Sequence, residues 1–389
     1  MSGVNKRKQN GKVKKPAEFK PIVMSDSYGE WLCSDDGLKL FIRHWKPQNR
    51  ETQACLHIVH GMGEHSLRYE RIAQRLCKEG IEVWVADQRG HGKTADPLIN
   101  NLGLGGLLGH CADKDAIGKV TSDIHLINNS IRNTYPNLPL FLLGHSWGSY
   151  ISQNYIESYA DYPLAGCILS GTRGPGDFFK LKAGKSVLKV LAALKDARKG
   201  SILARNLVDG PLNKPFKPNR TDFDWLSRDN AEVDLYVADP QCGAVCSVGF
   251  YRDLIILLSS IHKPSAMDKI RRDLPVYVFG GSADPAGNMG VSPTALVNAY
   301  RSLGIADLEF VLYPDARHEA LNETNRDEVS ENLISWIKRH YNRCDKDSNK
   351  KDKQDKEEVL MEKDKSKKNE DLSENGYNIN SGEDVELSD

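Results

Sequence analysis

Long hydrophobic runs are absent from this 389-residue sequence. None of its apolar stretches approaches the roughly 20 residues that a helix needs to cross a bilayer, so a membrane-spanning helix is excluded. The N-terminal stretch MSGVNKRKQNGKVKKPAEFKP carries charges but no apolar region after them, which is not the pattern of a secretory signal. We therefore expect a cytoplasmic protein, with any membrane contact limited to its surface.

Closely paired cysteines are also scarce. The eight cysteines are spread singly, without the spacing of metal-ligand pairs, and several lie in apolar segments. This distribution is typical of reduced, mostly buried thiols rather than of a disulfide framework or a metal site. Cys242 and Cys246 are the one close pair, and we interpret them as core residues. We expect no metal.

Aromatic side chains are scarce in the basic N-terminal arm, where Phe19 near its end is the single one. Lys6–Lys20 has neither interleaved aromatic residues nor a nucleic-acid-binding motif, so it does not predict a nucleic-acid partner. From Asp345 onward lysine alternates with acidic residues, and both ends have too few apolar residues to form a core. We predict disordered charged tails over 1–24 and 344–389, with the folded domain at 25–343. No feature of the sequence indicates an oligomeric state.

The domain between these tails alternates strand-like and helix-like segments. A hairpin is predicted over Trp31–Trp45, and six short runs rich in Val, Ile, Leu or aromatic residues predict buried strands. The runs are Ala54–Val59, Ile81–Ala86, Leu138–Leu143, Ala165–Leu169, Leu274–Phe279 and Leu308–Leu312. Helical periodicity lies between them, for example at Tyr69, Ile72 and Leu76 and at Val329, Leu333, Trp336 and Ile337. This pattern predicts an α/β fold with a mostly parallel central sheet flanked by helices.

One connection in this pattern, from 171 to 272, is much longer than a crossover requires, which indicates an inserted element. We interpret residues 172–262 as a helical cap. Within it, Phe178–Leu207 alternates apolar residues with lysines, as an amphipathic helix does. Such a helix most commonly packs on the domain below it, and we favour that interpretation. The alternative is a basic lid that makes transient contact with a membrane surface.

The stretch LFLLGHSWGS at 140–149 joins an apolar run to a helix-like pattern. Its GHSWG motif is typical of a sharp strand-to-helix turn that lifts a serine hydroxyl above the end of a sheet. Small residues on both sides let the backbone bend tightly. We expect the strand to end at Gly144 and Ser146 to be a nucleophile. Because a glycine-rich chain can contain this motif by chance, the hypothesis needs partner residues.

A serine nucleophile needs a general base and an acid that orients the base. In a doubly wound sheet, such residues lie on loops that follow strands. Among the eleven histidines, His318 follows the last predicted strand, and Asp284 follows the strand before it. The resulting order of serine, acid and histidine is the one this architecture uses. Asp239 and Asp315 are rival acids, but neither ends a strand as Asp284 does.

An oxyanion hole supplies two N–H donors to the tetrahedral intermediate. The residue after the nucleophile provides one, which is Trp147 here. The second is expected from the loop HGMGEH at 60–65, whose glycines allow the Met62 N–H to turn toward the serine. The alternative is that this loop only connects a strand to a helix.

Six motifs in order resemble a known family: HGMGEH followed by SLRYE, DQRGHGKT, GHSWGS, VADPQCG, GSADP and ARHEALNE. Over almost all of 25–341 the chain is similar to the monoacylglycerol lipases and lysophospholipases among the α/β-hydrolases, which overlap with the serine aminopeptidase (Hydrolase_4) group. The resemblance implies an α/β-hydrolase fold and a cap over an acyl-binding tunnel, with no cofactor. It also implies a triad and an oxyanion hole made by Ser146, Asp284, His318, Met62 and Trp147. The residue after the nucleophile is often methionine in these lipases, so we expect the tryptophan to narrow or reshape the pocket floor.

The resulting hypothesis is a serine hydrolase that cleaves carboxylic esters of lipids, either monoacylglycerol or lysophospholipid, through an acyl-enzyme. A small-ester carboxylesterase and a serine aminopeptidase are alternatives on the same triad. An aminopeptidase needs acidic groups in the cap to bind a substrate ammonium. Acidic residues cluster there at Asp222, Asp224, Asp229, Glu232 and Asp234. A non-catalytic binding module is a further alternative, although such modules usually lack a triad member.

Overall fold

The structure is a computed structural model that describes residues 29–176 and 196–342. The predicted tails at 1–24 and 344–389 lie outside the described residues, and so does most of the predicted amphipathic helix, 178–195. The bounds of the folded domain and the disorder of the tails therefore stay predictions.

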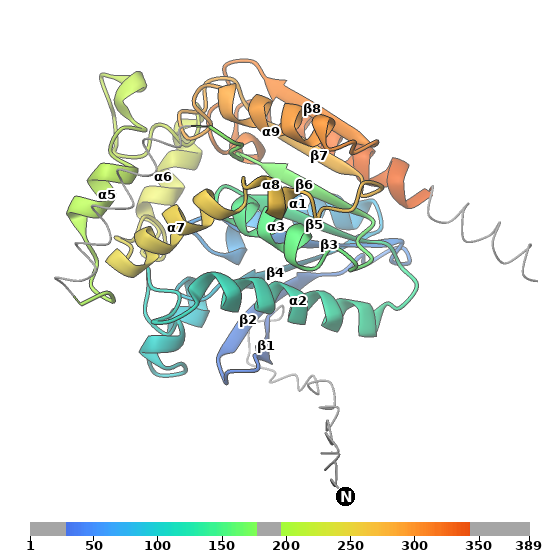
Figure 1. Cartoon of the computed structure of the whole chain (residues 1–389), viewed down its shortest axis with the longest axis horizontal. Helices are drawn as coiled ribbons and strands as arrows, with labels where there is room; N and C mark the ends of the chain where they lie inside the picture. Colours follow the sequence, from blue (N-terminus) through green and yellow to red (C-terminus); the bar gives the residue numbers. More distant parts are fainter. Residues whose placement is uncertain (1–28, 177–195, 343–389) are drawn as a thin grey trace, which may run out of the picture. The chain divides into compact units, whose positions relative to one another are not determined.

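An eight-stranded sheet forms the centre of the fold, with the strands in the order β1-β2-β4-β3-β5-β6-β7-β8 (Figure 1). β1 pairs antiparallel with β2, and β2 antiparallel with β4, whereas all other neighbours are parallel. The strands are β1 (Gly29–Cys33), β2 (Lys39–Trp45), β3 (Ala54–Val59), β4 (Ile81–Asp87), β5 (Leu140–His145), β6 (Gly166–Ser170), β7 (Val276–Gly281) and β8 (Leu308–Tyr313). The predicted α/β class and the hairpin are confirmed, and all six runs form strands. The expected burial of Leu308–Leu312 is wrong, because β8 lies at the edge of the sheet and is only half-buried before Tyr313.

The expected end of β5 at Gly144 is wrong, because the strand continues to His145. Gly144 pairs with Leu169 of β6 and with Val59 of β3, and His145 pairs with Ser170. A glycine keeps its backbone N–H and C=O, so it can extend a ladder whose flanking strands supply the partners. The apolar run therefore ends two residues before the strand does, although all six residues of β5 are buried.

Helices cover both faces of the sheet. Alternate strand residues point to opposite faces. Leu140 and Leu142 of β5 share a core with residues of α2, α3 and α9, whereas Phe141 between them contacts Trp336 of the last helix, with ring centroids 5.9 Å apart. The covering helices are α1 (Glu70–Lys78), α2 (Ala116–Thr134), α3 (Trp147–Ser158), α9 (Val291–Ser302) and a helix that begins at residue 326. Both helical patterns read from the sequence are thereby confirmed.

The long insertion contains helices in its described part, and α5 and α6 lie beside one end of the sheet (Figure 1). The helix α7 packs against both α2 and α3. These helices are α5 (Ile202–Val208), α6 (Asn230–Ala238), α7 (Val248–Ser260) and α8 (Pro264–Met267). Short 3-10 helices lie at Ser66–Tyr69 (η1), Gly92–Ala95 (η2), Leu102–Leu104 (η3), Lys214–Phe216 (η4) and Ala320–Asn322 (η5). Among the helices described, none combines the length and the apolar content that spanning a bilayer requires.

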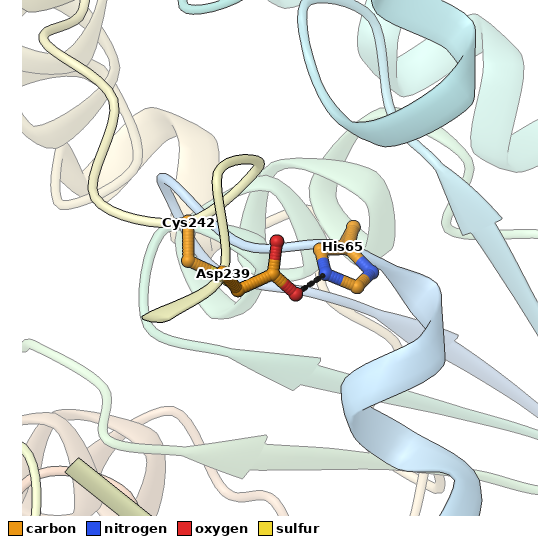
Figure 2. Close-up of side chains that lie close together, drawn as sticks. All are labelled: His65, Asp239 and Cys242. Atoms are coloured by element: carbon orange, nitrogen blue, oxygen red, sulfur yellow. Dashed lines mark hydrogen bonds and ion pairs between the residues drawn. The ribbon is translucent and has the colours of Figure 1, made fainter. Parts of the chain in front are cut away.

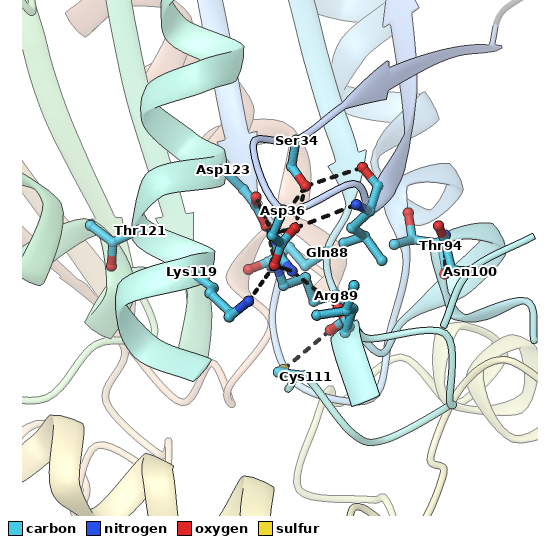
Figure 3. Close-up of polar contacts among 12 residues, drawn as sticks. Ser34, Asp36, Gln88, Arg89, Thr94, Asn100, Cys111, Lys119, Thr121 and Asp123 are labelled. Carbon is cyan, nitrogen blue, oxygen red and sulfur yellow. Dashed lines mark hydrogen bonds and ion pairs between the residues drawn. The ribbon is translucent and has the colours of Figure 1, made fainter. Parts of the chain in front are cut away.

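A buried arginine ties the opening hairpin to the rest of the domain (Figure 3). Arg89, on the loop after β4, is 2% exposed and donates two hydrogen bonds to Asp123 of α2, at 2.5 and 2.8 Å. It also donates to both carboxylate oxygens of Asp36 in the hairpin turn, at 2.8 and 3.0 Å, and Lys119 pairs with the same carboxylate. Burial opposes ionisation of Asp36, but these donors hold its pKa below the ordinary value. The turn of the predicted hairpin is thus fixed by charge as well as by Gly37, whose φ of 87° favours a residue without a side chain.

Glu157, on α3, is a buried carboxyl group. Its side chain is 5% exposed, and its Oε1 atom has no hydrogen-bond partner among the described residues. Burial raises its pKa from 4.5 to about 9, although the charge of Lys269 acts in the opposite direction. The folded protein therefore holds this proton more tightly than the unfolded chain does. The resulting stabilisation is complete below about pH 4.5 and is lost as the pH rises toward 9.

We predict that Glu157→Gln, which keeps the shape of the side chain but cannot ionise, becomes more stable than the wild type as the pH rises. The difference in the free energy of unfolding should change by about 3 kcal/mol between pH 4.5 and 7. Urea unfolding across this range measures it, with the exposed Glu51→Gln as the matched control. A difference that stays constant with pH contradicts the protonated, buried state of Glu157.

Candidate active site

Ser146 stands on a turn of unusual backbone conformation between β5 and α3. Its φ of 52° and ψ of −123° lie outside the regions that ordinary side chains favour. A Cβ atom at Gly148 would lie 2.1 Å from the Val59 carbonyl oxygen, and one at Gly144 would lie 2.4 Å from the Ser152 hydroxyl. Both glycines of the motif are therefore required by close approach.

The three predicted catalytic side chains lie in one line of hydrogen bonds. His318 Nε2 is 2.8 Å from Ser146 Oγ, and His318 Nδ1 is 3.0 Å from Asp284 Oδ2. Asp284 follows β7, and His318 follows β8, so both come from the loops that the sequence indicated. The histidine and the aspartate are 2% and 3% exposed, so water has little access to their hydrogen bond.

The charges around His318 favour its protonated form. Burial lowers the pKa of its imidazole, but the neighbouring Asp284 carboxylate outweighs this effect, and the carboxylates of Glu319 and Glu64 add to it. The pKa of His318 is therefore raised above its ordinary value. Conversely, the pKa of Asp284 is lowered, because the interaction with His318 and the N–H donated by Ala286 outweigh its burial. This arrangement stabilises an imidazolium between a carboxylate and a hydroxyl.

The rival acids lie elsewhere. Asp239 accepts a hydrogen bond from His65 Nε2 at 2.8 Å, and Cys242 lies beside them (Figure 2). Asp315 is an exposed turn residue with a φ of 57°. The His65, Asp239 and Cys242 ligand atoms lie within 4.8 Å of one another, and their types could hold a metal ion. The hydrogen bond already accounts for their proximity, and it anchors the turn after α6 to the HGMGEH loop.

The HGMGEH loop lies against Ser146. Met62 and Ser146 line the same cavities, and the Gly63 carbonyl accepts hydrogen bonds from the Gly243 N–H at 2.9 Å and from the Tyr236 hydroxyl at 2.8 Å. Neither the Met62 N–H nor the Trp147 N–H has an acceptor among the described residues. Both backbone donors are therefore free to bind another group.

The Trp147 ring forms part of the contact between the core and α7. It stacks on His91, with ring centroids 5.5 Å apart, and lies 5.2 Å from Phe250 of α7. Its side chain is 5% exposed and lines one of the cavities at Ser146. The tryptophan therefore shapes this cavity while it joins α3 to α7.

Two cavities of similar size meet at Ser146. One has a volume of about 540 Å³ and a largely apolar wall, and the other has a volume of about 510 Å³ and a more polar wall. Apolar residues of the first include Leu207, Val208, Leu212, Leu254, Ile255 and Leu258. Polar residues of the second include Arg205, Asn206, Asn213, Lys214, Lys217 and Asn219. A bound ester could thus place its two halves in chemically different surroundings.

Comparison with known proteins identifies the family. Residues 50–325 match the family described as Serine aminopeptidase, S33 (Hydrolase_4). The chain belongs to this family of α/β-hydrolases. It is 31% identical to human monoglyceride lipase over 259 residues, which cover 65% of this chain and 72% of that protein. It is 27% identical to the monoacylglycerol lipase of Mycolicibacterium smegmatis over 305 residues, which cover 78% and 94% of the two chains.

Solved structures resemble this hydrolase over most of its length. A highly thermostable carboxyl esterase from Bacillus coagulans, in complex with glycerol, has a TM-score of 0.71 and 27% identity, and the match covers 80% of this chain and 98% of the esterase. A soluble variant of the Saccharomyces cerevisiae monoglyceride lipase has a TM-score of 0.61 and 22% identity, with 84% and 99% covered. The second match supports the α/β-hydrolase fold, in agreement with the parallel sheet.

Sequence reasoning missed a buried ion network beside the hydrolase's serine. Arg68 donates to Glu64 at 2.8 Å and to both oxygens of Glu319 at 2.7 and 2.8 Å. Glu64 also accepts the Gly61 N–H at 2.5 Å and the Tyr69 hydroxyl at 2.9 Å. One guanidinium thus joins the HGMGEH loop to the residue after His318. The spacing of Glu64 and Arg68, four residues apart, was the available signal.

This network adds a net negative charge near His318, because two carboxylates share one guanidinium. We predict that Glu319→Gln lowers the pKa of His318, since the Glu319 carboxylate is one of the charges that raise it. The midpoint of the imidazole titration, followed by NMR, should move to lower pH by roughly half a unit to one unit.

The acid limb of the pH dependence of kcat/KM should move in the same direction, because a general base acts only when it is unprotonated. Glu331→Gln, on the exposed surface, serves as the control. An unchanged or higher midpoint would show that Glu319 does not act on His318 electrostatically.

Proposed function

We propose that this α/β-hydrolase cleaves long-chain monoacylglycerols through an acyl-enzyme on Ser146. The observation that carries the proposal is the hydrogen-bonded line of Ser146, His318 and Asp284 at the junction of an apolar and a polar cavity. Its relatives in human and in Mycolicibacterium smegmatis are monoglyceride or monoacylglycerol lipases, which supports a lipid ester as the substrate.

The proposed mechanism assigns one role to each side chain. His318 accepts the Ser146 proton as the hydroxyl attacks the ester carbonyl, and Asp284 orients the imidazole and stabilises its positive charge. The Met62 and Trp147 N–H groups stabilise the oxyanion. His318 then donates the proton to the leaving alcohol, and water hydrolyses the acyl-enzyme by the reverse sequence. None of these steps requires a cofactor.

The two cavities suit the two halves of the substrate. The acyl chain would lie along the apolar wall, where Leu254 and Leu258 of α7 remove it from water. The glycerol would lie in the polar cavity, near side chains such as Asn213 and Arg205, which can bind hydroxyl groups. In this proposal the described part of the cap, 172–176 and 196–262, forms the roof of both cavities.

The proposal also includes contact between the cap and a membrane surface. Ile202, Leu203 and Leu207 of α5 are 68%, 53% and 52% exposed. Leu207 also lines the apolar cavity, so the exposed apolar surface continues into the acyl site. A lipid that leaves a membrane surface at α5 would reach Ser146 along this wall without crossing water.

The acidic residues of the cap argue against the aminopeptidase alternative. Asp229 pairs with Arg326 at 2.7 Å, Glu232 pairs with Arg71 at 2.5 Å, and Asp234 pairs with Arg220. The other two are Asp224, which accepts hydrogen bonds from Thr221, and Asp222, which lies 3.8 Å from Arg205. Because each carboxylate faces a donor of the protein, this cluster is not a vacant site for a substrate ammonium.

The wild-type protein should release palmitate from monopalmitoylglycerol, and Ser146→Ala should lower kcat by roughly ten-thousand-fold or more, because the acyl-enzyme cannot form. Palmitoyl lysophosphatidylcholine, a short p-nitrophenyl ester and an aminoacyl anilide complete the substrate panel, and Ser302→Ala on α9 is the control. Full activity of Ser146→Ala contradicts the nucleophile assignment. Hydrolysis of the short ester alone contradicts the lipid substrate.

Narrowing the apolar cavity should lower kcat/KM for long-chain esters more than for short ones. Leu254→Trp adds bulk to its wall, so kcat/KM for monopalmitoylglycerol should fall about tenfold or more, whereas that for a p-nitrophenyl acetate substrate should change little. Leu235→Trp, at an exposed position of α6 outside both cavity walls, is the matched control. An equal loss on both substrates would place the acyl chain elsewhere.

A further inference from the structure

Two hydrogen-bond donors in the apolar cavity have no acceptor among the described residues. Tyr150 and Arg173 both line this cavity, and their side chains carry a hydroxyl and a guanidinium donor group. Across 29–176 and 196–342, neither group has a hydrogen bond or an ion pair. Tyr150 is 5% exposed and Arg173 is partly buried. A guanidinium and a phenol without a described acceptor are unusual in a wall that otherwise suits a hydrocarbon chain, because their N–H and O–H groups favour an acceptor over an apolar neighbour.

The backbone that carries these donors is fixed. The Arg173 carbonyl accepts hydrogen bonds from Gln153 Nε2 at 3.0 Å and from His262 Nε2 at 3.2 Å. The next residue, Gly174, donates its N–H to the Ser292 hydroxyl at 3.1 Å. Tyr150 lies on α3 one turn after Ser146. The two donors are therefore held by the same framework that positions the serine, which reduces the entropy lost on binding a ligand.

The other ionisable groups of this cavity do not neutralise the guanidinium. Burial lowers the pKa of His262 to about 4, so its ring is neutral at physiological pH. Burial raises the pKa of Asp209 to about 6, so this group is still largely ionised at physiological pH, but it accepts a hydrogen bond from the Tyr251 hydroxyl at 3.0 Å, and the cation that acts on it is Arg205 rather than Arg173. Within the described part of the chain, Arg173 is the one arginine or lysine in the wall of this cavity.

We propose that Tyr150 and Arg173 form a subsite for a negatively charged oxygen group of the substrate. The inference rests on the proposed function and narrows its substrate class. A guanidinium presents a fork of N–H donors that matches a carboxylate or a phosphate, and a phenol adds a third donor. Two sources carry this chemistry: a carboxylate borne by the acyl chain, and the phosphate of a lysophospholipid head group. The apolar wall beside the subsite favours the acyl-chain carboxylate.

The test compares charged and uncharged substrates that share one reacting ester. The glycerol monoester of hexadecanedioic acid places a carboxylate on the acyl chain, palmitoyl lysophosphatidic acid places a phosphate on the head group, and monopalmitoylglycerol carries neither. Arg173→Met and Tyr150→Phe remove the donors with little change in shape, and Arg301→Met, exposed on α9, is the matched control.

We expect Arg173→Met to lower kcat/KM for one charged substrate about tenfold or more, with the loss mainly in KM, and to have a much smaller effect on monopalmitoylglycerol, which carries no anion. Tyr150→Phe should give a smaller loss on the same substrate. The charged substrate that is affected identifies the source of the anion. Equal effects on charged and uncharged substrates, or no effect on either charged one, would overturn the subsite.

A second readout does not depend on lipid hydrolysis. Hexadecanedioate and palmitate are compared as inhibitors of the hydrolysis of p-nitrophenyl butyrate. The dicarboxylate should inhibit the wild type more strongly than palmitate does, and Arg173→Met should abolish the difference. If no lipid is cleaved but this difference exists, the proposed function fails and the subsite stands. If lipids are cleaved, the two acids inhibit equally in the wild type and the variant, and Arg173→Met affects neither charged substrate, the subsite fails alone.

Discussion

The turn at Ser146 approaches β3 so closely that no side chain fits between the two backbones. A Cβ atom at position 148 would lie 2.1 Å from the Val59 carbonyl oxygen, well inside any permitted contact. This approach sets the direction in which α3 leaves the sheet. It thereby places the Trp147 N–H beside the serine and Tyr150 in the wall of the apolar cavity. The strained φ of Ser146 is stabilised by the strand and the helix packed on either side of it.

Shared arginines hold the loops around this turn. Arg89 joins Asp36 of the hairpin to Asp123 of α2, and Arg68 joins Glu64 to Glu319. In each case two carboxylates bind one guanidinium, so each group depends on the others to offset the cost of its burial. The two networks differ in what lies next to them. The first contacts only structural elements, whereas the second adds negative charge beside His318 and so affects its pKa.

The sequence predicted those features that depend on local pattern. Apolar runs located every strand of the parallel sheet, and the position after a strand selected Asp284 and His318, which the structure brings next to Ser146. Strand ends were less accurate, because Gly144 is paired by neighbours that its own sequence does not specify.

Contacts between distant segments could not be read from the sequence. Arg68 and Glu319 are 251 positions apart, and His65 and Asp239 are 174 apart. Their pairing follows from how the loops at the end of the sheet converge. The same is true of Tyr150 and Arg173, since a missing acceptor is visible only when all the neighbours of a donor are known.

The two cavities that meet at Ser146 have a consequence for the order of events in catalysis. Under the proposed mechanism, the alcohol departs through the polar cavity while the acyl group stays in the apolar one. The nucleophile that attacks the acyl-enzyme then arrives through the polar cavity, which the alcohol has just left. Water is one such nucleophile, but another alcohol of similar shape would meet the same groups. An enzyme built in this way can transfer an acyl group between alcohols as well as hydrolyse it, and the water content of the polar cavity governs the balance between the two outcomes.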